Sequence, residues 1–363
     1  MEEIRCYGCG AVIQSNDEKK IGYVPKNALN KEKILCRRCF KLKNYHELQE
    51  AKLTDDDFLN ILNQIGEDNC LVVYLIDIFD FNGSMIQGLV RHINHNDMIV
   101  IGNKRDILPK SIKDHKIIMW INRQLKKEGI KPLDVLLTSG KKNYHLDELM
   151  DLIDKYRKGR NVYVVGVTNV GKSSLINALL KSYCDDESFI TTSEFPGTTL
   201  NLIEIPLDEN SSLFDTPGII NRHQIAHIID KDDLKTVLPQ SELNPVNYQL
   251  NDKQSLYFGG LARFDFIKGK KISLTCYFNK KLKVHRTKLE NADDLYNRHY
   301  TLKPEIKNLK TIEDFKTYQF TLPNYKVDIV ISGLGFITMK NEKAIIEVKV
   351  PQGVGVFIRD ALI

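Results

Sequence analysis

Two short stretches of this chain have the residue types and spacing needed to bind a nucleotide. Gly166–Ser173, GVTNVGKS, matches the pattern GxxxxGKS, in which backbone N–H groups surround a phosphate and the lysine reaches the outer phosphate oxygens. The apolar run Val162–Val165 predicts a strand before this loop, and a helix is expected to begin at Lys172 and add positive potential at its N-terminus. We therefore predict a phosphate-binding loop with four nucleotide contacts, the third of them also a Mg²⁺ ligand: Gly171, Lys172, Ser173 and Ser174.

The second stretch predicts which base is bound. Asn103, Lys104, Arg105 and Asp106 form an NKxD motif directly after the apolar run Met98–Ile101. A carboxylate at Asp106 can accept two hydrogen bonds from the N1 and N2 donors of guanine, which adenine does not offer together. The motif therefore predicts guanine, although these four residues alone also fit a polar turn at a helix start.

A supporting loop follows the run Leu133–Leu137. Thr138–Lys141, TSGK, fits the SAK-type loop whose backbone touches the guanine O6, with Ser139 and Gly140 as the contacts. By itself this motif is weak evidence for a guanine site, and it supports one only together with the other motifs.

Two further motifs are typical of nucleotide-sensing switches. Asp215–Gly218, DTPG, matches DxxG, in which the aspartate holds a Mg²⁺-bound water and the glycine N–H senses the γ-phosphate. Pro196–Thr199, PGTT, offers a threonine to complete the Mg²⁺ coordination, with Thr199 preferred and Thr198 as the alternative. The residues expected to serve hydrolysis are Lys172, Thr199, Asp215 and Gly218. The order base, base, phosphate, switch, switch is a rotation of the usual GTPase order.

The elements around these motifs predict an α/β fold with a mainly parallel sheet covered on both faces. Strands are expected at Leu71–Ile76, Met98–Ile101, Leu133–Leu137, Val162–Val165, Leu202–Ile205 and Ser212–Phe214. Helices are expected at Ser84–Asn94, Ile112–Lys127, Leu146–Lys158 and Lys172–Lys181.

Beyond residue 250 the pattern predicts a β-rich domain, after a bridge that is helical at Asp232–Val237. Strands are expected at Leu256–Ile267, Ile272–Phe278, Lys283–Leu289, Lys326–Ile331, Gly335–Met339, Ala344–Val350 and Val354–Ile358. We expect three parts: a metal-binding module (1–50), a circularly permuted P-loop GTPase domain (51–225), and a linker with a β-rich, RNA-binding domain (226–363).

The positive charge is concentrated in that last part. The chain has a net charge of +5, and residues 251–363 hold 20 lysines and arginines against 12 acidic residues. Eight basic residues follow one another without an acidic residue between them: Lys268, Lys270, Lys271, Lys280, Lys281, Lys283, Arg286 and Lys288. This run is typical of a polyanion-binding face, and a solvated lysine-rich hairpin is the alternative.

Four cysteines predict a metal site near the N-terminus. Cys6 and Cys9 form one CxxC pair and Cys36 and Cys39 another, with 26 residues between the pairs. Two such turns can present four thiolates to one tetrahedral ion, so we predict structural Zn²⁺. Iron can occupy the same thiolates. A thioredoxin-like redox pair would need a CxxC at a helix start after a strand, a setting that neither pair has.

The composition is that of a soluble globular protein, with 42% hydrophobic and 27% charged residues. Its longest apolar run, Leu71–Ile76, is too short to span a bilayer, and the N-terminus has no signal-peptide pattern. We expect a cytoplasmic protein with no membrane partner, and a monomer in solution.

Over its whole length the chain resembles the YqeH family of circularly permuted bacterial ribosome-assembly GTPases. The resemblance is carried by the CxxC pairs, the permuted motifs, Asp77–Phe81 (DIFDF) and Asp294–His299 (DLYNRH). It implies a C-terminal domain similar to the trp RNA-binding attenuation protein, and rRNA or the small (30S) ribosomal subunit as partner.

Hydrolysis has an unusual feature in this chain. Ile219 stands where Ras-type GTPases have the glutamine that orients the attacking water, and a hydrocarbon cannot do this. We expect slow unaided turnover and a possible activating partner. Asn169, within the phosphate loop, resembles the asparagine of K⁺-dependent GTPases and predicts K⁺ binding beside the phosphates, with a purely structural asparagine as the alternative.

Three functions fit these observations. The first is a GTP-driven assembly factor that binds rRNA or pre-ribosomal small subunits, using GTP or GDP, Mg²⁺, Zn²⁺ and K⁺. The second is a K⁺-dependent GTPase in tRNA modification. The third is an RNA-binding protein for which GTP is only a structural ligand.

Overall fold

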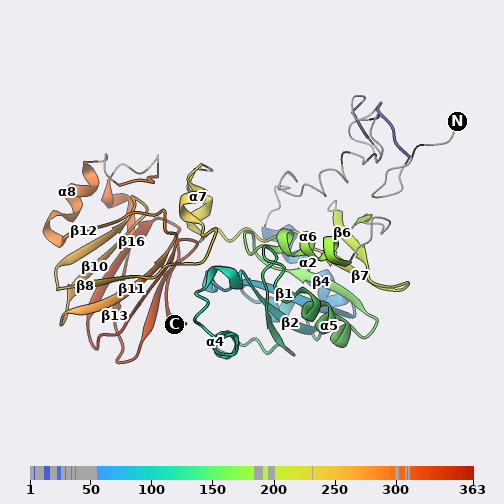
Figure 1. Ribbon diagram of the computed structural model, residues 1–363, viewed down its shortest axis with the longest axis horizontal. Helices are drawn as coiled ribbons and strands as arrows, with labels where there is room; N and C mark the ends of the chain where they lie inside the picture. Colours follow the sequence, from blue (N-terminus) through green and yellow to red (C-terminus); the bar gives the residue numbers. More distant parts are fainter. Residues whose placement is uncertain are drawn as a thin grey trace. The chain divides into compact units, whose positions relative to one another are not determined.

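The structure is a computed structural model, and Figure 1 follows its elements along the chain. It describes residues 55–183, 191–194, 201–230, 232–298, 302–306, 309 and 311–363, together with 4, 12–16, 23–25, 29, 34 and 37. These residues form two compact units. The first comprises described residues of Met1–Ile76, Ile86–Arg105 and Ile121–Ile220; the second comprises those of Asp77–Met85, Asp106–Trp120 and Asn221–Ile363.

A seven-stranded sheet with the order β3-β2-β1-β4-β7-β6-β5 forms the centre of the first unit. Its strands are β1 (Cys70–Asp77), β2 (Asp97–Asn103), β3 (Val135–Leu137), β4 (Asn161–Val165), β5 (Thr191–Glu194), β6 (Asn201–Pro206) and β7 (Ser212–Asp215). The pairs β2–β3, β1–β4 and β4–β7 are parallel, whereas β6 pairs antiparallel with β5 and β7. The sheet is therefore mixed, with a parallel part that carries the phosphate-binding loop.

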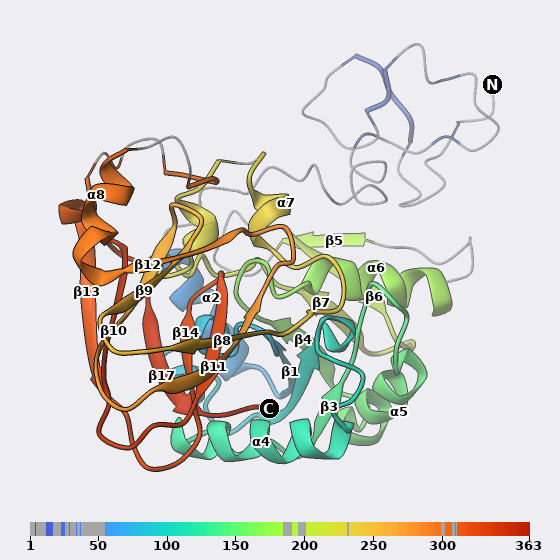
Figure 2. The same ribbon diagram turned by 60° about the vertical axis from the view of Figure 1, so that its left-hand side comes forward.

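Among the described residues, five helices contribute to the first unit: α2 (Asp55–Glu67), α3 (Leu89–His92), α4 (Asp114–Lys127), α5 (Leu146–Arg157) and α6 (Lys172–Tyr183). Helix α4 begins in the second unit and enters the first at Ile121. Figures 1 and 2 label α5 and α6 beside the strands of the sheet. The sequence prediction omitted α2, although its buried Phe58, Ile61, Leu62 and Ile65 have the spacing of an amphipathic helix.

The predicted helix Ser84–Asn94 was wrong. The structure has only the short turn η3 (Asn82–Ser84) and the four residues of α3 there. Gly88 lies between them with φ +71°, a left-handed conformation that interrupts a helix. The Ser84 hydroxyl also holds a loop conformation, because it accepts from the Asp77 N–H (3.0 Å) and donates to the Asp80 carbonyl (2.8 Å).

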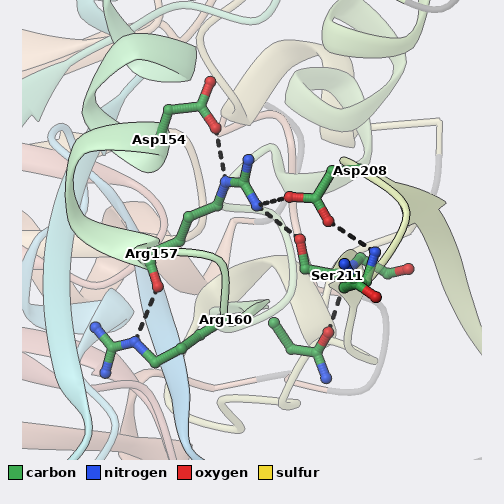
Figure 3. A network of polar contacts seen from close by, with 8 residues as sticks. Asp154, Arg157, Arg160, Asp208 and Ser211 are labelled. Carbon is green, nitrogen blue, oxygen red and sulfur yellow. Dashed lines mark hydrogen bonds and ion pairs between the residues drawn. The ribbon is translucent and has the colours of Figure 1, made fainter.

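Two arginines form hydrogen bonds at the three-residue connection between α5 and β4 (Figure 3). Arg157 donates to Asp154 (2.6 Å), Asp208 (2.5 Å) and Ser211 (2.6 Å), and Arg160 donates to the Arg157 carbonyl (2.9 Å). The Arg157 guanidinium is the main reason why the pKa of the Asp208 carboxyl lies well below its usual range. A lowered folded-state pKa means that this contribution to stability is present above the usual aspartate range and is lost as the pH falls.

The second unit contains two five-stranded sheets that enclose one apolar core. One sheet has the order β12-β9-β10-β16-β13 and the other β17-β14-β15-β11-β8, and every recorded pairing within them is antiparallel. The bounds are β8 (Val246–Leu250), β9 (Gln254–Phe258), β10 (Ala262–Lys268), β11 (Ile272–Phe278), β12 (Val284–Lys288), β13 (Phe315–Thr321), β14 (Val327–Ile331), β15 (Gly335–Met339), β16 (Ile345–Pro351) and β17 (Val356–Asp360). Short helices α7 (Leu234–Val237) and α8 (Ala292–Asn297) complete it. We call the two sheets with their connections, residues 246–360, the β-sandwich.

The predicted single strand Leu256–Ile267 is a hairpin. Gly259 and Gly260 interrupt it, so that β9 and β10 pair antiparallel. The prediction also missed β8 and β13, because both are edge strands whose exposed residues weaken the alternating pattern.

Two segments from the first half of the chain also belong to the second unit. In Asp77–Met85, the ring of Phe79 lies 6.1 Å from that of Phe336, and in Asp106–Trp120 the Trp120 indole donates to the Asp360 carbonyl (2.9 Å). The compact unit therefore contains more than the contiguous C-terminal residues.

Candidate functional site

The phosphate-binding loop has the strand–loop–helix setting that its sequence predicts. Residues 166–171 connect β4 to α6, and Lys172 is the first residue of that helix. Gly171 has φ +89°, and a Cβ there would lie 2.4 Å from the Asn103 side-chain nitrogen. Only glycine fits this position, because both the backbone conformation and the close approach exclude a side chain.

Asn103 joins three loops of the first unit. Its side chain donates to the carbonyls of Val170 (2.8 Å) and Gly171 (3.4 Å), and it accepts from the Thr138 hydroxyl (3.4 Å) and the Gly140 N–H (3.3 Å). Only 2% of Asn103 is exposed, so these bonds are made away from bulk water. The structure thus brings the NKxD motif and the TSGK loop to the phosphate loop.

Neighbouring residues strengthen this connection. The Lys104 ammonium donates to the Asn169 carbonyl, and the Arg105 N–H donates to the Thr138 carbonyl (3.0 Å). Ser139 is buried, with 1% exposed. Asp106, the predicted guanine acceptor, is half-buried in the turn η4 (Arg105–Ile107) directly after β2.

The DxxG aspartate lies against the phosphate-loop lysine. Asp215 ends β7, the parallel neighbour of β4, and its carboxylate is 2.8 Å from the Lys172 ammonium. Asp215 is 3% and Lys172 8% exposed, so the pair is shielded from solvent. Half-buried Ser173 follows in the first turn of α6. A serine hydroxyl and a carboxylate are oxygen donors of the kind Mg²⁺ prefers, so Ser173 and Asp215 fit their predicted role.

The residue after DxxG is held by its backbone. Ile219 forms a parallel bridge with Val167: its carbonyl accepts from the Thr168 N–H (2.7 Å), and its N–H donates to the Gly166 carbonyl (3.3 Å). A Cβ on Gly218 would lie 3.3 Å from Thr168. Switch and phosphate loop are therefore joined by main-chain bonds, which no residue type in the sequence could have revealed.

The chain then enters the second unit and is held again within a few residues. Asn221 donates to the Gly83 carbonyl (2.7 Å), and Gln224 donates to the Asp80 carboxylate (3.0 Å). The Ile225 N–H donates to the Ser332 carbonyl in the turn between β14 and β15 (3.0 Å). Segment 221–225 is thus fixed both to the loop after β1 and to the β-sandwich.

Six predicted site residues lie outside the described part of the chain: Thr199, its alternative Thr198, and the four cysteines Cys6, Cys9, Cys36 and Cys39. Asn169 is exposed and has φ +66°, a conformation that asparagine adopts more readily than most residues. In the described part of the chain, no group of three or more His, Cys, Asp or Glu side chains has the arrangement of a metal site.

Two family models match the chain. Residues 161–255 match the model described as "50S ribosome-binding GTPase", a range that includes the phosphate loop and DxxG. Residues 271–362, most of the β-sandwich, match "YqeH-like, C-terminal". Among the described residues no helix has the length and apolar character needed to cross a membrane.

Several known proteins are similar to the chain. "Uncharacterized protein YqeH" of Bacillus subtilis is 51% identical over 100% of both chains. "Putative nitric oxide synthase" of Oryza sativa is 30% identical over 92% of this chain and 69% of its own. Among solved structures, GNP-bound YlqF from T. maritima matches 49% of this chain and 71% of its own, with 20% identity and a TM-score of 0.32.

Asn103→Ala tests whether that side chain organises the nucleotide site. We expect GDP and GTP affinity to fall by about tenfold or more, since several buried polar groups lose their partner at about 1–3 kcal/mol each. Titration with fluorescent nucleotides measures the effect, and Lys142→Ala, at an exposed residue directly after the TSGK loop, is the control. A folded Asn103→Ala protein with unchanged affinities would contradict this assignment.

Proposed function

The chain belongs to the YqeH family of GTPases with circularly permuted motifs, and on that basis we propose that it is a GTP-hydrolysing switch in small ribosomal subunit assembly. The observation that carries the proposal is the double attachment of the segment after DxxG. Ile219 is hydrogen-bonded to the phosphate loop. Gln224 is hydrogen-bonded to Asp80, and Ile225 to Ser332. A γ-phosphate that draws Gly218 toward itself would disturb the hydrogen bonds of Ile219 to the phosphate loop. The displacement would then act on the segment that Gln224 and Ile225 hold in the second unit.

In the proposed reaction the protein mainly positions charge. Lys172 would leave Asp215 for the β and γ oxygens, and Ser173 and Asp215 would hold Mg²⁺ directly or through water. The ion supplies positive charge to the phosphates when bound. Ile219 has no polar side-chain atom to orient water, so we propose that turnover is slow until a partner places the water or adds charge.

RNA is the proposed partner because of the charge of the β-sandwich. Residues 251–363 carry eight more basic than acidic residues. Such a surplus favours binding to a phosphate backbone and makes the affinity depend on salt. The name "50S ribosome-binding GTPase" belongs to the matched family model, and the choice of the small subunit rests on the family resemblance.

The function is tested by GTP turnover with ribosomal particles at low salt. We expect small-subunit particles or their precursors to raise turnover by about tenfold or more, since an added charge or positioned water is worth orders of magnitude. Large-subunit particles and the Lys172→Ala variant are the controls. Stimulation by tRNA with a modifying enzyme, and not by particles, would favour the tRNA function. Binding without any turnover would favour structural GTP, and neither turnover nor affinity responding to particles would refute the proposal.

We further propose K⁺ as the charge beside the phosphates, held by Asn169. Its exposed side chain lies in the phosphate loop, while its own carbonyl is occupied by Lys104. Wild-type turnover should be about tenfold or more faster in K⁺ than in Na⁺ at equal ionic strength, as expected for one well-placed positive charge. Asn169→Gly, which keeps the backbone conformation, should remove this ratio but retain GDP binding. Equal wild-type rates in the two salts would exclude K⁺.

Zinc binding by the four N-terminal cysteines also remains a proposal. Elemental analysis of protein purified without added metal should find one Zn²⁺ per chain. Cys9→Ser and Cys36→Ser should each lose it, because three thiolates form an incomplete structural site. Cys276→Ala, which changes a buried cysteine of the β-sandwich, is the matched control and should retain the metal. Wild-type protein without bound metal, or full retention of metal by both serine variants, would overturn the assignment, whereas iron in place of zinc would change only the identity of the metal.

A further inference from the structure

Strand pairing divides the connections of the β-sandwich between its two ends. Lys268 at the end of β10 and Thr321 at the end of β13 both pair with Ile345 at the start of β16. Val327 at the start of β14 pairs with Met339 at the end of β15. The connections 269–271, 322–326 and 340–344 therefore emerge at one end of the strands. The connection 251–253 and the turn 289–291 emerge at the same end, because Leu250 pairs with Ile272 and Lys288 with Gln254.

Hydrogen bonds join these three connections. The Asn341 side chain donates to the Lys270 carbonyl (2.7 Å), the Lys343 N–H donates to Leu322 (3.0 Å), and the Leu322 N–H donates to Ala344 (2.8 Å). We call this surface the lysine end, because the three connections and the last residue of β10 hold one acidic residue, Glu342, and six exposed lysines: Lys268, Lys270, Lys271, Lys326, Lys340 and Lys343. The connection 251–253 and the turn 289–291 add two exposed acidic residues, Asp252 and Glu290, and one lysine, Lys253, so lysines still predominate.

The acid-free run in the sequence is thereby split. Its first three lysines lie at the lysine end, whereas Lys280, Lys281 and Lys283 lie in the β11–β12 connection at the other end. That other end also binds the unit's own linker: Asn279 donates to the carbonyls of Leu238 (2.8 Å) and Lys235 (3.2 Å). Both ends have contacts within the unit, since the Trp120 indole donates to Asp360, which pairs with Val327 at the lysine end. Lysines from distant parts of the sequence gather only at the lysine end.

An aromatic side chain accompanies the lysines. Tyr325 lies in the connection 322–326, next to Lys326, and 54% of it is exposed. An exposed ring among lysines offers a surface on which an unpaired base can stack, and such stacking contributes about 1–3 kcal/mol per base. Bases paired in a duplex are not free to stack on it, and an acidic protein has no bases.

From the charge, the hydrogen-bonded connections and the exposed ring, we propose that the lysine end binds single-stranded RNA. The lysines contact successive phosphates and Tyr325 stacks on a base. This inference rests on the proposed function and assigns its RNA contact to one end of the β-sandwich, the end away from the linker contacts of Asn279 and Ser332.

Two charge-matched triple variants of the full chain test the assignment. One changes Lys268, Lys270 and Lys271 to Gln, and the other changes Lys280, Lys281 and Lys283 to Gln. Affinity for a labelled uridine oligonucleotide of about 20 nucleotides is measured at several salt concentrations. The lysine-end triple should lose about tenfold or more in affinity and reduce the log–log salt slope by about 2, since each phosphate contact on a single strand contributes about 0.7. The control triple should stay within about twofold.

Tyr325→Ala separates stacking from charge. It should weaken binding by about fivefold or more and leave the salt slope unchanged, because no phosphate contact is lost. Equal losses of RNA affinity in the two triple variants, or a larger loss in the control, would contradict the assignment of RNA binding to the lysine end but not RNA binding itself. Wild-type protein that binds no RNA at low salt would refute the proposed RNA partner as well. Unchanged thermal unfolding of the variants confirms that each effect concerns binding.

Discussion

The short segment between Ile219 and Gln224 carries the chain from the first compact unit into the second. Ile219 is joined to the phosphate loop by two main-chain hydrogen bonds, and Gln224 is joined to the buried carboxylate of Asp80. Five residues can span at most about 17 Å. Both ends of this segment are thus hydrogen-bonded, one within each unit. Circular permutation has this physical consequence: the segment after the switch leads directly into another compact unit.

The attachment in the second unit is specific because it is polar and buried. Asp80, Gln224 and Ser332 are at most 4% exposed, and an unmatched polar group in such surroundings costs about 1–3 kcal/mol. Nearby, buried Arg359 pairs with Asp328 (3.4 Å) and lies over the Trp120 ring at 4.8 Å. Burial raises the pKa of Asp328 and lowers the pKa of Arg359, so the pair is costly to desolvate. Removal of either partner would leave the other charge buried without its counter-ion, which is strongly destabilising.

The sequence predicted those features that depend on local pattern. A glycine-rich loop between an apolar run and a helix identified β4, the phosphate loop and α6, and the NKxD and DxxG motifs each follow a strand as expected. Contacts between residues far apart in the chain could not be predicted in this way. The main-chain pairing of Ile219 involves no side chain, and inclusion of Asp77–Met85 in the second unit depends on bonds across more than 130 residues. The basic run looked continuous because linear sequence does not show that β11 carries the chain from one end of the β-sandwich to the other.

We infer that nucleotide state and RNA binding are coupled through the segment held at Gln224. Thermodynamic linkage then requires the RNA affinity to differ between protein saturated with a non-hydrolysable GTP analogue and protein saturated with GDP. The most direct measurement is that pair of affinities for wild type and for Gln224→Ala. We expect a difference of about fivefold or more in wild type and its loss in Gln224→Ala, with nucleotide affinity retained. Equal wild-type affinities in the two states, or a difference that survives in Gln224→Ala, would contradict this coupling.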